Sequence, residues 1–473
     1  MAFRGGLPGV VSTVALAVPL SVSIAEAANR CDVSPGRSSE TIVVGNLLLG
    51  AEGADRGAVL VVDGRIAAVG EPEDVRSSAP EATVIDCGSL HVSPGFINAH
   101  EHPRSSGGFP DPGMRPAYSH RDEWQGNAGA EHYELQWAAA EDPIHQFWIE
   151  LRHLLAGTTT LAGSGAVPGL LKNASWRDEP AYVYPADTRT FPYGVATETF
   201  AGLPCPYEGP STFDPALGRG FPPTAPYTPH IAEGTNCTAA LEGRFYLDYV
   251  ARNPGRRYAL VHGVGLDAAS IERLGDLDVT LVWSPRSNLA LYGATVDMPA
   301  ALRAGARVAI GTDWSYSGSY NLFEEFRCAE GVDRELWDDS LSARDLWRMA
   351  TEHAAYALGI ERLTGKLEPG LAADLLVFEN RADDPYAGLV DSTTADVVAT
   401  FVDGELVSGR SDAFDAAQLP ATCGNPIGEH FLCVDYAAYG FGHDELLRAN
   451  EQAIPLFSNE RQASCGAFER PRR

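Results

Sequence analysis

Short apolar runs recur along the chain, and turn signals or polar residues close them. Such runs cover residues 42–44, 58–62 and 65–69 near the start, and 373–378 and 397–402 near the end. The dipeptide Asp63-Gly64 separates two of the early runs, and this pairing is typical of a tight β-hairpin turn. Two β-rich pieces that flank a long middle predict one small β-sandwich domain built from both ends of the chain.

The middle of the chain alternates strand-like with helix-like runs, which indicates a parallel α/β architecture. Strand candidates that end in polar residues lie at 157–160, 227–230, 259–262, 281–284 and 308–313. In a (β/α)8 barrel of the TIM type, the functional side chains lie at the carboxyl ends of the strands. The polar endings therefore favour an α/β fold of this kind, with its site at one end of the barrel.

These patterns divide the chain into five parts. We expect a signal peptide at 1–28, the two parts of the sandwich at 29–89 and 366–410, the barrel at 90–365, and a Cys-containing C-terminal extension at 411–473 that lies outside both domains. The stretch 202–229 is rich in Pro and Gly and has no periodic pattern. It predicts an extended loop that could cover the site as a lid.

The N-terminus has the pattern of an export signal. Arg4 precedes an apolar run over 10–24, and Ala25-Glu26-Ala27 follows it as a small-x-small cleavage site. The alternatives are a membrane anchor or a frayed terminus, but Ser and Pro interrupt the run and it is short for a span. We therefore expect an exported protein, periplasmic or secreted.

Charge and cysteine content restrict the partners and the compartment. The 473 residues carry a net charge of −28, which argues against binding to nucleic acid or to an anionic membrane. Eight cysteines in an exported chain make disulfides plausible. We expect Cys205 to pair with Cys237, one bridge to staple the C-terminal tail, and Cys87 and Cys328 to be buried free thiols.

Candidate metal ligands close several of the apolar runs. The run that ends at Ile97 leads into His100 and His102, which are spaced i and i+2 and so point the same way from a strand. His230 and Asp313 complete a set of three imidazoles and one carboxylate. That set leaves room for a water molecule, which is typical of a catalytic rather than a structural zinc site.

The order of these motifs resembles the amidohydrolase superfamily, in its cytosine-deaminase and triazine-hydrolase-like branch. The motifs that carry the resemblance lie at 94–102, 157–160, 230–233, 261–262, 285–288, 311–313, 321–325 and 365–375. The resemblance implies that His100 and His102 are first-strand metal ligands. It also implies that His230 is the fifth-strand ligand and Asp313 the eighth-strand carboxylate.

The same resemblance assigns roles in proton transfer. Glu233 is expected to be the acid/base that serves a ring nitrogen of the substrate, and His262 to polarise the substrate or orient the water. Asp313 can accept the proton of that water. Some members of the superfamily hold two metals through a lysine on the fourth strand, but Lys172 and Lys366 are the only lysines here and neither is suitably placed. One divalent ion is therefore expected; zinc is favoured, and iron(II) suits the same donors.

Two departures from the family pattern concern the substrate. Trp283 stands where many relatives have a seventh-strand histidine, and no Pro-His-Ala-Pro-Tyr-like motif is found on the fourth strand. We expect Trp283, Arg286 and Trp314 either to shape the substrate pocket or simply to pack.

The sequence therefore predicts a mononuclear metal-dependent hydrolase of C–N bonds other than peptide bonds. Its substrate would be a small molecule, and the favoured reaction is deamination of a heterocycle or opening of a cyclic amide. The alternatives are a silent, ligand-binding protein of the same fold, or a hydrolase of an ester, lactone or carbon–halogen bond. The sequence leaves open whether the chain forms a homo-oligomer.

Overall fold

The computed structural model describes residues 29–50, 53–110, 114, 118–127, 134–165, 167–177, 179, 182–216, 221–457 and 465. The predicted signal peptide at 1–28 lies outside the described residues. Within these ranges, no helix combines the length and the apolar character that a membrane span requires.

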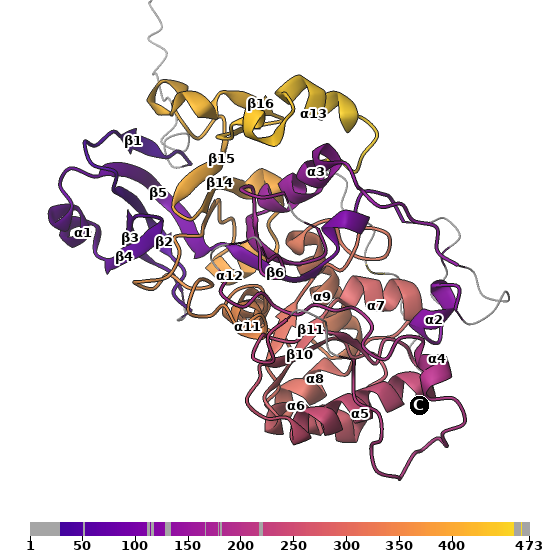
Figure 1. The fold of residues 1–473 in the computed structure, drawn as a ribbon. Coiled ribbons are helices and arrows are strands. Elements are labelled where there is room, and N and C mark those ends of the chain that lie inside the picture. Colours follow the sequence, from indigo (N-terminus) through magenta and orange to yellow (C-terminus); the bar gives the residue numbers. More distant parts are fainter. Residues whose placement is uncertain are drawn as a thin grey trace, which may run out of the picture.

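Strands from both ends of the chain form one large sheet. They are β1 (Asp32–Ser34), β2 (Thr41–Leu47), β3 (Asp55–Val62), β4 (Arg65–Gly70), β5 (Thr83–Pro94), β13 (Leu375–Phe378), β14 (Val397–Val402), β15 (Glu405–Arg410), β16 (Asn425–Ile427) and β17 (His430–Leu432). The order is β16-β17-β15-β14-β13-β5-β2-β3-β4, and β1 pairs with β5. In Figure 1 the indigo N-terminal strands therefore lie beside the orange ones. The antiparallel pair β5–β13 is the seam between the two ends of the chain.

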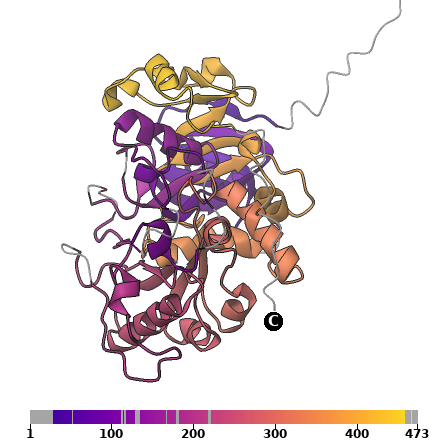
Figure 2. The ribbon, with the colours of Figure 1, turned by 90° about the vertical axis from the view of Figure 1, so that its right-hand side faces the viewer.

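The C-terminal extension is not separate from this sheet, which differs from the expectation that 411–473 lies outside both domains. Strand β17 pairs antiparallel with β15 and continues the sheet, so that β15 has a partner on both sides. Pairing of this kind satisfies backbone groups that an open edge would leave free. Helix α13 (His443–Ala449) then packs on α3 (Pro143–Leu154), and the yellow segment lies against the purple and orange parts in both views (Figures 1 and 2).

Two parallel sheets occupy the middle of the chain. One contains β6 (Phe96–Glu101), β7 (Thr158–Gly163) and β8 (Lys172–Asn173); the other contains β9 (His230–Ile231), β10 (Tyr258–His262), β11 (Val279–Trp283) and β12 (Val308–Ile310). All neighbouring strands within them are parallel. The expected parallel α/β middle is present, although the regular pairing is divided between two sheets.

Hydrogen bonds outside the regular strands join these sheets at both edges. The backbone N–H of Asp313 donates to His100 O at 3.0 Å, which links the end of β12 to β6. On the other side, Ala186 N donates to Ala174 O, directly after β8, at 2.7 Å, and the chain continues through Thr228 N to Asp187 O and Ala259 N to Tyr227 O, both at 2.9 Å. The carboxyl ends of β6, β9, β10 and β12 therefore meet in one region.

Helices cover the parallel strands and the large sheet. Besides α3 and α13 they are α1 (Pro72–Ser78), α2 (Arg121–Trp124), α4 (Ala196–Thr199), α5 (Cys237–Arg252), α6 (Ala268–Asp276), α7 (Pro285–Tyr292), α8 (Met298–Arg303), α9 (Leu322–Leu336), α10 (Ala343–Met349), α11 (Glu352–Ala357) and α12 (Pro385–Val390). The short 3-10 turns are η1 (Pro103–Ser105), η2 (Thr394–Asp396), η3 (Ala416–Gln418), η4 (Ala421–Cys423) and η5 (Tyr436–Tyr439). Helices α5, α6, α8 and α9 bury apolar side chains in the same core as β10–β12.

The structure brings the eight cysteines together in four pairs. Cys205 lies next to Cys237, with Cα atoms 6.2 Å apart, as expected. Cys87 and Cys328, which were expected to be free, lie instead against Cys31 and Cys465. The pairing of β1 with β5 brings Cys31 to Cys87, and Cys465 lies against Cys328 of α9. The fourth pair is Cys423 with Cys433.

Candidate metal centre and active site

The four expected metal ligands and His262 come together at the ends of four strands. The Asp313 Oδ1 atom lies 3.0 Å from His100 Nε2 and 3.3 Å from His102 Nε2. The imidazole of His230 has its ring centre 4.5 Å from that of His100 and 4.9 Å from that of His262. The strand-end pattern in the sequence therefore identified side chains that are neighbours in space.

The backbone turns sharply where these side chains leave the strands. His262, Asp313 and Ala232 have φ angles of 72°, 61° and 56°, in the left-handed region that residues with a Cβ rarely adopt. Such strain is found mainly where the surrounding structure fixes a functional side chain. The packing beside His100 is also close. A Cβ at Gly311 would lie only 2.6 Å from the backbone and side chain of His100, so this position accommodates only glycine.

The donor set fits a divalent metal ion. Ligand atoms of His100, His230, His262 and Asp313 lie within 4.8 Å of one another, and all four residues are buried. Two of these atoms, His230 Nδ1 and His262 Nε2, have no hydrogen-bond partner among the described residues. Buried polar atoms are rarely left unpaired, so lone pairs gathered in this way suit a metal or a bound water. His102 is less buried than the others, and the tightest set includes His262 in its place.

The protonation states agree with this chemistry. Burial lowers the pKa of His100 to about 4 and holds that of His230 well below its usual value, so both rings are neutral at pH 7. Burial alone would raise the pKa of Asp313, but the hydrogen bonds with His100 and His102 hold it well below the usual range. His100 and His230 are therefore neutral and Asp313 is ionised, the forms that bind zinc, whereas for His102 burial is outweighed by the hydrogen bond with Asp313, which raises its pKa.

Glu233 adjoins this cluster in its protonated form. Burial raises the pKa of Glu233 to about 8, while the positive charge of Arg121 opposes the rise. The hydroxyl of Tyr292 donates to Glu233 Oε1 at 2.7 Å, and the same oxygen lies 3.8 Å from His262 Nε2. At neutral pH the side chain can therefore give up a proton beside the metal ligands.

Glu233 lies three residues after His230, but the two residues do not share a helix. Helix α5 begins only at Cys237, because the side chain of Asn236 accepts from Ala239 N and caps it there. Glu233 instead stands on a turn in which Ala232 has a positive φ. A turn, rather than a shared helix face, brings Glu233 and His230 to one place.

A buried ion pair that the sequence did not indicate supports this turn. The guanidinium of Arg121 lies 2.6 Å and 2.7 Å from the two carboxylate oxygens of Glu242, and neither side chain is exposed. Glu242 also accepts from Ala232 N at 3.1 Å, while Arg121 N donates to Glu233 O at 3.2 Å. Arg121 stands between two predicted elements and Glu242 inside a helix, so no pattern linked them to the site.

Of the three expected pocket residues, only Trp314 lies beside the cluster. It follows Asp313 directly, and its ring centre is 5.6 Å from that of Trp124 and 6.0 Å from that of Trp137. Trp283 is fully buried in the core, with its ring 5.9 Å from that of Trp337. The Arg286 side chain extends toward α9 and donates to Ser319 Oγ at 2.7 Å and to Glu324 O.

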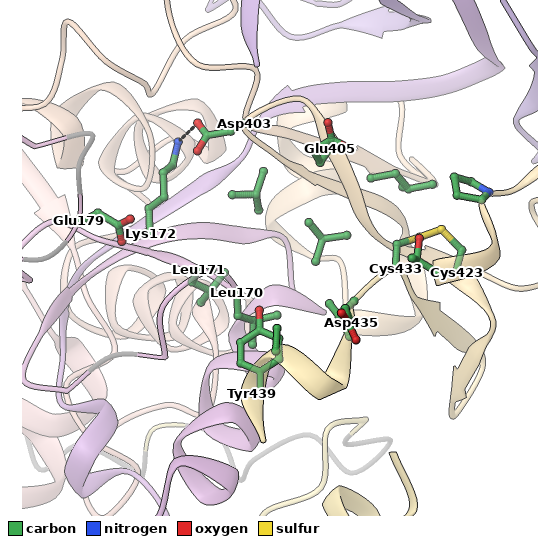
Figure 3. A pocket seen from close by; sticks show the side chains of 18 residues that line it. Leu170, Leu171, Lys172, Glu179, Asp403, Glu405, Cys423, Cys433, Asp435 and Tyr439 are labelled. Carbon is green, nitrogen blue, oxygen red and sulfur yellow. Dashed lines mark hydrogen bonds and ion pairs between the residues drawn. A yellow bond between two sulfur atoms is a disulfide. The ribbon is translucent and has the colours of Figure 1, made fainter. Parts of the chain in front are cut away.

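A separate cavity of about 510 Å³ lies between the segment 169–179, the turn that joins β14 to β15, and the residues 420–439 (Figure 3). None of the clustered histidines or Asp313 lines it. Lys172 does, and its Nζ contacts Asp374 Oδ2 at 2.5 Å and Asp403 Oδ1 at 2.9 Å. Lys172 therefore joins the first parallel sheet to the large sheet and is engaged outside the cluster.

Comparison with known proteins also points to a metal-dependent hydrolase. Residues 230–407 match the model of the amidohydrolase family, and residues 57–82 match that of the bacterial imidazolonepropionase-like composite domain. The chain is 28% identical to the 5-methylthioadenosine/S-adenosylhomocysteine deaminase of Syntrophobacter fumaroxidans over 75% of this chain and 88% of that protein. It is 26% identical to the guanine deaminase of Escherichia coli over 75% and 92% of the two chains.

A solved structure extends the likeness to the fold. The zinc-bound adenosine deaminase of Xanthomonas campestris superposes with a TM-score of 0.53 at 18% identity, over 88% of this chain and all of that one. The chain matches the amidohydrolase family over residues 230–407, and over three quarters of its length it resembles curated deaminases. It is thus an enzyme of the class that hydrolyses C–N bonds other than peptide bonds.

Proposed function

We propose that the cluster holds one divalent metal ion, with zinc favoured, through His100, His102, His230 and Asp313. Two imidazoles converge on a single oxygen of Asp313, and the unpaired nitrogen of His230 lies next to them. The solved relative that carries zinc supports the choice of metal. Such an ion lowers the pKa of a bound water toward about 7 and so supplies a nucleophile near neutral pH.

The protein side chains then divide the proton transfers between them. Asp313 is ionised and can accept the proton of the attacking water, because its pKa lies well below neutrality. Glu233 is protonated at pH 7 and can deliver its proton to a ring nitrogen of the substrate. His262 lies between them and is neutral, so it can accept a hydrogen bond from water or substrate through Nε2. The gathering of the ligand atoms of His100, His230, His262 and Asp313 within 4.8 Å of one another, with the Glu233 carboxyl beside His262, is the observation that carries the proposal.

The reaction that this arrangement supports best is hydrolytic deamination of a nitrogen heterocycle. Attack of water at the ring carbon that bears the amine needs a proton for the ring nitrogen and later one for the departing ammonia, and Glu233 and Asp313 can supply both. Two of the curated relatives are named 5-methylthioadenosine/S-adenosylhomocysteine deaminase and guanine deaminase. Trp314 follows Asp313 directly, and with the neighbouring rings of Trp124 and Trp137 it forms an aromatic group on which a flat ring can stack.

We also propose that the two parallel sheets are parts of one (β/α)8 barrel. The hydrogen bonds that join β12 to β6, and those through Asp187 and Tyr227, support a closed ring of strands. Export is likewise a proposal, supported by the signal-like pattern at 1–28. Four cysteine pairs with no cysteine left over fit an oxidising compartment, where they would form disulfides.

Product analysis on a panel of substrates tests the function, with release of ammonia, release of chloride and opening of the cyclic amide each measured. The metal-loaded enzyme is offered methylthioadenosine, guanine, cytosine, an aminated triazine, a chlorinated triazine and a cyclic amide, and His230→Ala serves as the metal-deficient control. We expect ammonia from at least one aminated ring, and none when His230 is replaced. Turnover of only the chlorinated ring or the cyclic amide by the metal-loaded enzyme would overturn the proposal of deamination.

A further inference from the structure

We propose that helix α7 positions the proton-handling groups of the site, with Ser287, Asn288 and Tyr292 as the positioning residues. All three side chains are buried, and each one contacts a different group of the cluster. The roles of those groups rest on the proposed function. The contacts of α7 themselves follow from the structure alone.

Ser287 holds the carboxylate of Asp313. Its hydroxyl donates to Asp313 Oδ2 at 2.5 Å and lies 2.8 Å from Ser317 Oγ. The other oxygen, Oδ1, faces His100 and His102. Because the two oxygens have different neighbours, the hydroxyl fixes the rotation of the carboxylate and leaves Oδ1 for the metal side of the cluster.

Asn288 fixes the tautomer of His262. Its Nδ2 donates to Thr295 Oγ1 at 3.1 Å, which also accepts from Trp283 Nε1 at 2.9 Å. The amide is therefore oriented with Oδ1 toward His262 Nδ1, 2.8 Å away. An amide oxygen only accepts, so Nδ1 must carry the proton, and Nε2 presents a lone pair to the cluster.

Tyr292 binds one oxygen of Glu233 and leaves the other available to the substrate. Its hydroxyl donates to Oε1 and in turn accepts from Trp124 Nε1 at 2.8 Å. Oε2 has no hydrogen-bond partner among the described residues. In the protonated acid the proton therefore belongs on Oε2, the oxygen that is free to meet a substrate.

The helix is itself held firmly enough to act in this way. Pro285 opens it, and Gly293 closes it in a left-handed conformation. On the side away from the cluster, Arg286 N donates to Glu325 Oε1 at 3.2 Å and Arg286 Nε donates to Ser319 Oγ. One short helix thus sets the positions of Asp313, His262 and Glu233 together.

The test compares three α7 variants with a matched tyrosine control. Ser287→Ala, Asn288→Leu and Tyr292→Phe each remove one contact. Tyr246→Phe removes an equally buried hydroxyl, which donates to Ala259 O at 2.7 Å and does not touch the cluster. The readouts are the rate at which a chelator removes zinc, measured without substrate, then kcat and KM separately, and the melting temperature.

Each α7 variant has its own expected result. Ser287→Ala should lose zinc to the chelator about ten- to a hundredfold faster, since a hydrogen bond to a ligand contributes about that much. Tyr292→Phe should keep its zinc and its KM but lose about tenfold or more in kcat. Asn288→Leu should also lose kcat, and Asn288→Asp should restore part of it, because aspartate keeps the acceptor oxygen. Tyr246→Phe should leave zinc retention and kcat unchanged despite a similar loss of melting temperature.

Two results would overturn the positioning role. One is a Ser287→Ala protein that retains zinc as the wild type does, and the other is a Tyr292→Phe protein whose kcat falls no further than that of Tyr246→Phe. A wild-type enzyme that deaminates no heterocycle would refute the proposed function alone, because zinc retention by Ser287→Ala is measured without any substrate and still decides the role of α7.

Discussion

Replacing Glu233 with Gln separates proton transfer from everything else this side chain does. At pH 7 a carboxyl with a pKa of about 8 is about nine-tenths protonated, so the exchange is between two neutral groups of one shape. The Gln oxygen can still accept from the Tyr292 hydroxyl. What disappears is the proton that Glu233 can transfer.

The size of the effect follows from that single loss. General acid–base catalysis contributes about 10²–10⁴-fold, which equals about 2.7–5.4 kcal/mol in the activation free energy. Stability should change by less than about 1 kcal/mol, since the hydrogen bond and the neutral charge are kept. Zinc content should not change, because Glu233 is outside the proposed ligand set.

The assay follows ammonia release on the best substrate, with zinc measured by elemental analysis and unfolding by calorimetry. Glu150→Gln is the matched control: Glu150 is another buried carboxyl with a pKa raised to about 8, but it accepts from Val167 N, away from the cluster. Glu150→Gln should turn over normally. If Glu233→Gln stays within tenfold of the wild type, or if the control loses as much activity, the assignment of Glu233 as the acid is wrong.

The remaining predictions concern metal, pH and stability. Elemental analysis of the purified protein should find one divalent ion per chain; His102→Ala should empty the site while His262→Ala keeps the ion, and the opposite pattern would move His262 into the ligand set. The wild-type kcat/KM should fall as pH rises through about 8, because burial raises the pKa of Glu233 and only its protonated form donates; a profile that is flat to pH 10 at constant zinc content would contradict this. Burial also raises the pKa of Glu150 in the folded state to about 8, above an unfolded value of about 4.3, so the folded state holds the proton that the unfolded state has lost. The free energy of unfolding of the wild type should therefore fall by about 2 kcal/mol between pH 6 and 8. Denaturant unfolding should show that Glu150→Gln does not lose this stability.

Four of the five clustered residues could be predicted from local pattern, because His100, His102, His262 and Asp313 lie at or just beyond the end of an apolar strand, whereas His230 opens the short strand β9 and was found from the order of the motifs. His100, His262 and Asp313 lie far apart in the sequence, yet the rule that parallel strands end together brings them to one place. The supporting contacts carry no such signal. Tyr292 meets Glu233 across 59 residues of sequence, and in a helix of ordinary composition it looks like a packing residue.

A strand-end pattern also cannot say which way a side chain faces. Trp283 ends its strand as predicted, but the ring turns into the core toward Trp337, and Arg286 turns toward α9. The partner of Cys87 could not be predicted either. It depends on β1 lying beside β5, and no local sequence pattern fixes that register. Local periodicity indicates the elements, whereas their mutual contacts decide which residues reach the site.

The left-handed turns at His262 and Asp313 have a consequence for how the enzyme can change over time. Each chain segment changes direction directly after His262 or Asp313, so the loop that follows can vary without moving these side chains, provided that supporting contacts such as that of Ser317 with Ser287 are kept. Insertions and replacements in these loops can change which substrate is accepted while the clustered side chains keep their positions. We expect divergence of specificity in this lineage to concentrate directly downstream of the strained residues, and laboratory evolution aimed at new heterocycles to succeed best in the same segments.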